Sequence, residues 1–225
     1  KDYKLAIYHG QKAHALRPND PDAASTYFQH KQQACDWVGI EQLGTTIDVL
    51  VDASLAASRP AGEHPFINIS RTTDLARNYA VARSRSQAIK GRVKNRNLNA
   101  LRATGHKSPL IVGYLSSDFR DHPLGHLMLN FFALHDRNRA KVHAYSLGTN
   151  DSSIYRETIE ESCDRFVDLS KLSDHEAANQ IAIDGVDILI DLNSHTTGSR
   201  MEICAFRPAV LQITYLGFPG TSGAE

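Results

Sequence analysis

The sequence predicts an α/β fold, in which a doubly wound parallel sheet follows a mainly helical region. Short apolar runs suited to buried strands recur five times after Pro109, and helical stretches separate most of them. Before Pro109 the apolar residues follow helical spacing instead. Near-continuous apolar strands that alternate with helices indicate a parallel sheet covered on both faces. The five expected strands are residues 110–115, 141–147, 165–169, 187–192 and 211–217.

Residues 1–107 are expected to be mainly helical. The first helix ends at Pro18, which has no amide hydrogen to donate and clashes with the preceding turn. Ala6, Ala13 and Pro18 match the spacing of the second helix of a tetratricopeptide repeat. Gly10 stands where such repeats usually carry a large residue, and a plain amphipathic helix fits nearly as well. The expected parts are a tetratricopeptide-like end at 1–20, a helical linker region at 21–108 and the sheet domain at 109–225.

Capping residues predict where several helices begin. Asp20 or Asp22 can accept the free amide hydrogens of a helix that runs to about Trp37. Ser173 and Glu176 have the spacing of a capping box, in which each side chain accepts a hydrogen bond from the other residue's backbone amide. A further helix is expected over residues 41–57.

The charge balance argues against a general attraction of the chain to nucleic acid or to anionic membranes. Lys and Arg total 25, as do Asp and Glu, so the formal net charge is zero. The exception is local, because residues 77–107 hold nine basic and no acidic side chains. This run could bind phosphates or an acidic partner. Only Tyr79 supplies the aromatic contact that nucleic-acid binding favours, so we expect a solvated helical linker and no nucleic acid.

The cysteines and the apolar runs favour a soluble, cytoplasmic protein without a membrane partner. Cys35, Cys163 and Cys204 are odd in number, far apart and in no CxxC pair, which predicts neither disulfides nor a thiolate metal site. No apolar run approaches the roughly 20 residues of a transmembrane helix. The first ten residues also lack the apolar core of a signal peptide.

The stretch SSDFRDHPLGHL, residues 116–127, concentrates titratable side chains directly after the first expected strand. Ligands of such sheets bind outside the carboxyl ends of the strands, so Asp118, His122 and His126 are expected at the functional rim. Pro123 suits the first position of a helix, which makes His122 its N-cap and puts His126 one turn inside. The helix N-terminus should keep His122 neutral and able to accept a proton.

Each histidine has competing interpretations. His122 is either a general base or acceptor-binding group, or a simple helix cap. His126 is expected to turn inward as a structural residue. Together they have the i, i+4 spacing of a metal pair, but the stretch lacks the glutamate of an HExxH motif and an obvious third ligand. We therefore expect no metal.

Two later loops are candidate binding sites. His195, Thr196 and Thr197 follow the fourth strand, where free amides at a helix start can hold sugar hydroxyls or an anion, unless a threonine simply caps that helix. The loop GFPGTSG follows the fifth strand, and its glycines let backbone approach a ligand, although it could be a plain connection. The candidates in this loop are Gly217, Pro219, Gly220 and Thr221. Because a dinucleotide fingerprint, a P-loop and a nucleophile elbow are absent, hydride transfer, phosphoryl transfer and serine hydrolysis are disfavoured.

The segments VGYLSSDFRDHPLGHLM and DGVDILIDLNSHTTGSRMEICAFRPAVLQITYLGFPGTSGA, with the tetratricopeptide-like start, closely resemble the O-GlcNAc transferase family. The resemblance is strong over residues 110–224 and extends weakly to residues 30–37. It implies two Rossmann-type domains that face one cleft, preceded by a tetratricopeptide superhelix that presents the acceptor protein. It also implies an inverting, metal-independent and cofactor-free transfer of N-acetylglucosamine from UDP-GlcNAc to Ser or Thr hydroxyls of proteins.

The same resemblance implies roles for individual residues. His122 matches the histidine of the family's HP motif, which is a catalytic-base candidate. The UDP-contacting residues belong to the second Rossmann domain, so this chain alone is expected to be inactive, to bind nucleotide weakly and to associate with that second half. His195 stands where the family commonly has the aromatic residue of NGYT, which leaves open a Spindly-like transfer of fucose from GDP-fucose. The remaining alternative is a non-catalytic, protein-binding helical-repeat module.

Overall fold

The computed structural model describes residues 2–98 and 108–225, which fold into two compact units. The helical unit comprises Lys1–Ala88 and Gly220–Glu225, and the sheet unit comprises Ile89–Pro219. The boundary therefore lies inside a helix, before residue 109, and the last six residues join the helical unit instead of the sheet domain. No helix in the described part of the chain is long and apolar enough to cross a membrane.

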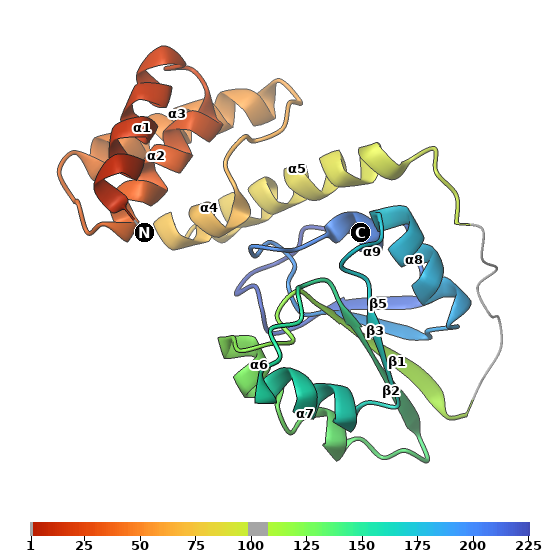
Figure 1. Ribbon diagram of the computed structural model, residues 1–225. Coiled ribbons are helices and arrows are strands. Elements are labelled where there is room, and N and C mark those ends of the chain that lie inside the picture. Colours follow the sequence, from red (N-terminus) through yellow and green to blue (C-terminus); the bar gives the residue numbers. More distant parts are fainter. Residues whose placement is uncertain (1, 99–107) are drawn as a thin grey trace. The chain divides into compact units, whose positions relative to one another are not determined.

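The N-terminal region is helical, as expected (Figure 1). Asp20 caps the second helix by accepting a hydrogen bond from the amide of Asp22, and this helix ends before the expected Trp37. The packed core of the helical unit includes Phe28 and Ile47. The helices are α1 (Tyr3–Leu16), α2 (Pro21–Gln33), α3 (Ile40–Ala56), α4 (Pro65–Arg71) and α5 (Leu75–Val93).

Gly10 lets α1 approach α2 closely. A Cβ atom added at Gly10 would lie 3.1 Å from the Cα atom of Tyr27 and 3.0 Å from Nδ1 of His30. Such contacts are tighter than ordinary van der Waals packing, so a large residue at this position would push the two helices apart. The tetratricopeptide-like character of residues 1–20 stays a prediction.

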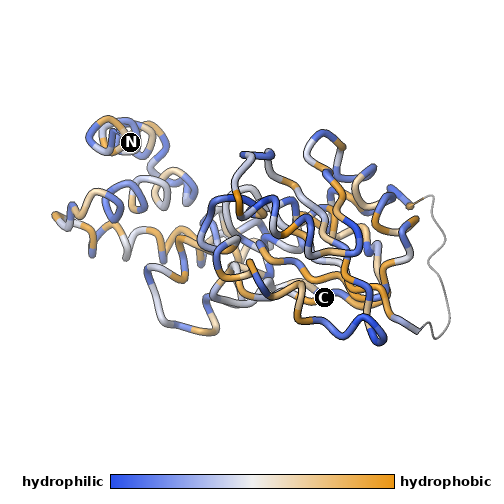
Figure 2. Tube along the Cα trace, turned by 60° about the horizontal axis from the view of Figure 1, so that its bottom comes forward, coloured by the Kyte–Doolittle hydropathy of each residue, from blue (hydrophilic) through white to orange (hydrophobic). Residues whose placement is uncertain are grey.

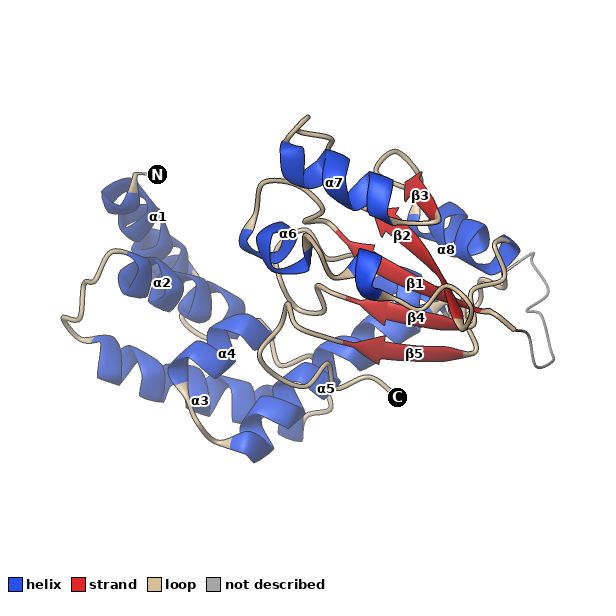
Figure 3. Cartoon of the chain, turned by 90° about the horizontal axis from the view of Figure 1, so that it is seen from below, coloured by secondary structure: helices blue, strands red, loops and turns tan. Residues whose placement is uncertain are grey.

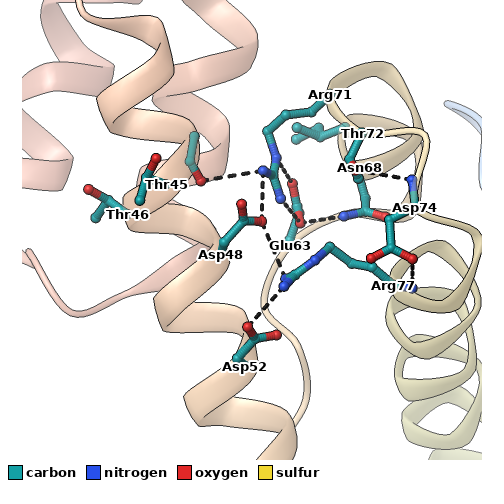
Figure 4. Close-up of polar contacts among 12 residues, drawn as sticks. Thr45, Thr46, Asp48, Asp52, Glu63, Asn68, Arg71, Thr72, Asp74 and Arg77 are labelled. Carbon is teal, nitrogen blue, oxygen red and sulfur yellow. Dashed lines mark hydrogen bonds and ion pairs between the residues drawn. The ribbon is translucent and has the colours of Figure 1, made fainter.

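An ion-pair network with a buried centre holds α3, α4 and the start of α5 together (Figure 4). The Glu63 side chain is fully buried and accepts two hydrogen bonds from Arg71, at 2.9 Å and 3.0 Å. Arg71 also pairs with Asp48 at 2.9 Å, and Arg77 pairs with Asp48 and with Asp52. Arg77 opens the basic run of the sequence, and its charge is thus neutralised within the fold.

The final six residues pack on α5 within the helical unit. The Ser86 hydroxyl donates a hydrogen bond of 2.6 Å to the carbonyl oxygen of Ser222. Gly223 has a φ of 65°, and a Cβ atom there would overlap the backbone of Arg83. Glycine is required at this point because the segment lies directly against the helix and adopts a left-handed conformation.

The sheet unit contains the five expected strands, and all four strand pairs are parallel. Figure 3 shows them side by side, in the order β3-β2-β1-β4-β5. The strands are β1 (Leu110–Ser116), β2 (Ala140–Ser146), β3 (Arg165–Asp168), β4 (Ile188–Asp191) and β5 (Leu211–Thr214). The connecting helices are α6 (Pro123–Met128), η1 (Phe132–Leu134), α7 (Ile154–Ser162), α8 (Asp174–Ile183) and α9 (Met201–Ala205). The predicted doubly wound fold is confirmed.

Each face of the sheet has its own apolar core. Tyr114 packs with side chains of α6, η1 and α7, whereas its neighbour Leu115 packs with side chains of α8 and α9. This alternation follows from the two-residue period of a strand. In the hydropathy colouring of Figure 2, apolar stretches alternate with hydrophilic stretches along the trace. The predicted capping box of Ser173 and Glu176 opens α8.

The strand order places the ends of β1 and β4 side by side. The chain runs from β1 to β2 on one side, while β4 pairs with β1 on the other, so the direction of winding reverses between β1 and β4. Leu115 faces Asp191 in the register of this pair. Open α/β sheets bind ligands at such a reversal point, beyond the carboxyl ends of the strands.

Candidate active site

The loops that follow β1 and β4 meet through buried polar side chains. Asn193 is central, because its Oδ1 atom accepts a hydrogen bond of 2.7 Å from the amide of Ser117. Its Nδ2 atom donates to Oδ2 of Asp118 at 2.8 Å and to the hydroxyl of Ser117 at 3.1 Å. All three residues are buried. These bonds join the two loops at the expected functional rim.

Asp191, the last residue of β4, stabilises the loop that follows this strand. Its carboxylate accepts hydrogen bonds from the backbone amides of Asn193 and Ser194, at 2.9 Å and 3.1 Å. Burial raises the pKa of the Asp191 carboxyl above its ordinary value, although the two amide hydrogen bonds act in the opposite direction. The Asp191 carboxylate therefore stabilises the turn that carries Asn193 by accepting hydrogen bonds from both of these backbone amides.

His122 is the N-cap of α6, as predicted from Pro123. Its Nδ1 atom accepts a hydrogen bond of 3.2 Å from the amide of Leu124, and its Nε2 atom lies 3.9 Å from Oδ1 of Asp118. An amide can only donate, so Nδ1 carries no proton and the neutral ring carries its proton on Nε2. In this geometry His122 presents a hydrogen-bond donor. The expected role as proton acceptor would require the helix cap to open.

His126 does not turn inward, so that expectation was wrong. Its side chain is 45% exposed, its Nε2 atom lies 2.7 Å from Oδ1 of Asp121, and its ring packs on Tyr155 with centroids 4.1 Å apart. The buried face of α6 is formed by its neighbours, among them Gly125, where a Cβ atom would overlap the carbonyl oxygen of Arg120. The close approach of the loop backbone to α6 therefore decides which residues face inward.

His122 and His126 are directed at different aspartates, Asp118 and Asp121, and do not form a metal pair. Across residues 2–98 and 108–225, no group of three or more His, Cys, Asp or Glu side chains is arranged to hold a metal ion.

The predicted binding residues of the β4 loop are placed differently from one another. His195 is buried, with its ring edge-on to Phe218 at a centroid distance of 5.2 Å. The Thr196 hydroxyl donates a hydrogen bond to the backbone carbonyl oxygen of Asn193 and accepts one from the side-chain amide of Asn193, both at 3.1 Å. Thr197 is exposed. Neither threonine caps α9, whose N-cap is Arg200.

The predicted residues of the β5 loop divide between the two units. Gly217 and Pro219 belong to the sheet unit, and Gly220 and Thr221 belong to the helical unit. A Cβ atom at Gly217 would overlap the carbonyl oxygen of Leu192, so glycine is needed here for packing of the chain on itself. Thr221 accepts a hydrogen bond of 3.1 Å from a backbone amide two residues on. A ligand-binding role for these four residues stays a prediction.

The two arginines in the loops at the strand ends are engaged within the protein. Arg200 donates to the carboxylate of Asp174 at 2.6 Å and to the carbonyl oxygens of Leu169 and Leu172. Arg120 pairs with Asp118 at 3.1 Å. Arg200 is thus committed to the fold, and the site has polar groups for hydroxyls but no dedicated cluster of cations for a diphosphate among these residues.

Comparison with known proteins places this arrangement in a family. The sequence profile of glycosyl transferase family 41 matches residues 34–225. A UDP-N-acetylglucosamine–peptide N-acetylglucosaminyltransferase of Caenorhabditis elegans is 34% identical over 208 residues, which cover 86% of this chain and 18% of that protein. The probable UDP-N-acetylglucosamine–peptide N-acetylglucosaminyltransferase SEC of Arabidopsis thaliana is 45% identical over 115 residues, 51% of this chain and 12% of that protein.

A solved structure shares the fold. A mutant of the O-GlcNAc transferase of Thermobaculum terrenum superposes on this chain with a TM-score of 0.73 and a sequence identity of 23%. The superposition covers 99% of this chain and 42% of the Thermobaculum chain. The chain thus spans less than a fifth of the length of each of the two curated relatives above. Because the family profile covers most of the sequence, the chain belongs to glycosyl transferase family 41.

Proposed function

We propose that the parent protein of this chain transfers N-acetylglucosamine from UDP-GlcNAc to Ser or Thr hydroxyls of proteins. The observation that carries the proposal is the buried junction of the β1 and β4 loops at the winding reversal, which holds Asp118 at 3.9 Å from the half-exposed His122. The names of the relatives in nematode and plant support the choice of donor and of a peptide acceptor.

The reaction needs a proton acceptor and stabilisation of the departing nucleotide. The acceptor hydroxyl oxygen forms a bond to the anomeric carbon, the bond from that carbon to the UDP oxygen breaks with its electron pair on UDP, and the hydroxyl proton is lost. We assign the proton to the carboxylate of Asp118. His122 then donates a hydrogen bond from Nε2 to a substrate oxygen, which is the role that its capped geometry permits.

We propose that a part of the parent protein outside these 225 residues holds the UDP diphosphate. The engaged state of Arg200 supports this proposal, because it leaves few cations in the strand-end loops to bind phosphates. The proposal invokes no metal or cofactor and places the protein in the cytoplasm, where UDP-GlcNAc and protein acceptors would meet. Titration calorimetry of the isolated chain with UDP should then show binding weaker than micromolar. Micromolar binding, which corresponds to a free energy of roughly 8 kcal/mol, would contradict this proposal.

Mass spectrometry of a serine-containing acceptor peptide tests the proposal. The full-length parent is incubated with the peptide and either UDP-GlcNAc or GDP-fucose, and the Asp118→Asn variant is the control. We expect addition of one N-acetylhexosamine by the wild type, and a loss of about 10²- to 10⁴-fold in rate for the variant. Transfer of fucose alone would establish the Spindly-like alternative. Peptide binding without any transfer would establish the non-catalytic protein-binding module.

A further inference from the structure

We infer that Asn193 is a positioning residue that holds the carboxylate of Asp118 in the orientation that faces His122. The inference rests on the proposed function, because it concerns the same site. Sequence patterns did not single out Asn193, which lies in the β4 loop, far along the chain from the stretch that contains Asp118.

The orientation of the Asn193 amide is fixed by its surroundings. The backbone amide of Ser117 can only donate a hydrogen, so the atom that it contacts at 2.7 Å must be the Asn193 oxygen. The nitrogen therefore points toward Asp118. The Nδ2 atom donates one hydrogen to Oδ2 of Asp118, at an N···O distance of 2.8 Å. Its other hydrogen is shared by the hydroxyl oxygens of Ser117 and Thr196, which each lie 3.1 Å from Nδ2.

The strand register brings Asn193 to this place. Leu115 and Asp191 face each other where β1 pairs with β4, and two residues beyond each of them come Ser117 and Asn193. Asn193 is 1% exposed, and its own amide is held by the carboxylate of Asp191 at 2.9 Å. The side chain thus leaves a hydrogen-bonded turn and is buried along its whole length.

Asn193 makes the two oxygens of Asp118 unequal. Oδ2 is occupied by the Asn193 amide, whereas Oδ1 faces Nε2 of His122 and pairs with Arg120. The Arg120 side chain is 39% exposed, so water competes for it and its restraint on the carboxylate is weak. The buried bond from Asn193 is shielded from water and therefore dominates the orientation of the carboxylate.

A double-mutant cycle in the full-length parent separates positioning from general support of the fold. Asn193→Ala removes a hydrogen bond to a charged group, so kcat should fall about 10- to 100-fold while the KM for the acceptor peptide changes little. In an Asp118→Asn background the same change should cost no more than about twofold, because the group on which Asn193 acts is already altered. An equal loss in both backgrounds, or a loss confined to KM, would overturn the inference.

Asn68 provides a matched control. It is as deeply buried as Asn193, and its Nδ2 atom donates to a carboxylate oxygen of Glu63 at the same distance of 2.8 Å, in the helical unit. Asn68→Ala should lower the melting temperature and leave kcat within about twofold of the wild type. Should Asn193→Ala not fold, Asn193→Ser leaves a smaller cavity, cannot reach Asp118, and should show the same loss of kcat.

A crystal structure of the Asn193→Ala parent distinguishes failure of this inference from failure of the proposed function. We expect the Asp118 carboxylate to be turned away from the orientation that faces His122, and an unchanged carboxylate would overturn the inference. This readout does not depend on transfer. A wild-type parent that transfers no sugar would refute the proposed function alone.

Discussion

Two substitutions of His122 should separate its capping role from its role in transfer. His122→Ala removes both the imidazole and the acceptor for the amide of Leu124, whereas His122→Asn removes the imidazole and keeps a side chain that caps helices well. The backbone of His122 is extended, with a φ of -155° and a ψ of 150°, which is the conformation of an ordinary N-cap residue. Asparagine can therefore replace it without strain.

The magnitudes follow from the two contacts. Loss of an N-cap costs about 1 kcal/mol, which lowers the melting temperature by about 2–4 °C if the domain that carries α6 unfolds as one cooperative unit of roughly 150–250 residues. Only His122→Ala should show this shift. Both variants lose the Nε2 donor, so both should lose about 10²- to 10³-fold in kcat, as is typical when one donor to a developing charge is removed.

Initial rates of transfer and thermal melts of the full-length parent give both readouts. A folded His122→Asn enzyme with full activity would refute any role of the imidazole in transfer and leave His122 as a helix cap. Equal melting temperatures for His122→Ala and the wild type would refute the assigned cap. A loss limited to the acceptor KM would make His122 a binding residue instead.

Three further predictions concern packing and reactivity. Gly217→Ala should destabilise the chain by about 1–3 kcal/mol in urea unfolding, because the new methyl group meets a backbone carbonyl oxygen. The control Gly91→Ala places its methyl group in open space on α5 and should not destabilise the chain. Glu63→Ala should cost about 3 kcal/mol in the same assay, since it leaves a buried guanidinium without its main partner; a cost below about 1 kcal/mol would contradict the buried pair. Burial raises the pKa of the Cys163 thiol to about 12, so iodoacetamide at pH 8 should label the exposed Cys35 first, and equal labelling in peptide mass spectrometry would speak against this order.

The sequence was sufficient for the sheet and for the start of α6. Apolar runs marked all five strands because each strand is short, apolar and bounded by polar loops, and β1, β2 and β4 also carry the buried residues of the sheet. Pro123 fixed the start of α6 through its missing amide, which made the capping role of His122 predictable. The signals for these features, an apolar run and a proline at a helix start, each lie within a short stretch of neighbouring residues.

The features that the sequence did not predict depend on how one segment packs against another. Helical spacing could not decide the direction of His126, since α6 is only six residues long and its buried face is set by the loop that packs on Gly125. The part played by Asn193 follows from the pairing of β1 with β4, whose residues are far apart in sequence. The only local signal was a run of polar residues directly after a buried strand.

The segment Gly220–Glu225 gives the protein an unusual order of assembly. The helical unit is interrupted after Ala88 and resumes at Gly220, so the whole sheet unit is inserted into it. A ribosome releases residues Lys1–Ala88 of this sequence well before the segment that packs on α5. Domains generally fold as units during synthesis, N-terminal first. Here the helical unit would begin to emerge before the sheet unit and be completed after it, so the sheet unit would fold while α5 still exposes the surface to which Ser222 and Gly223 later attach.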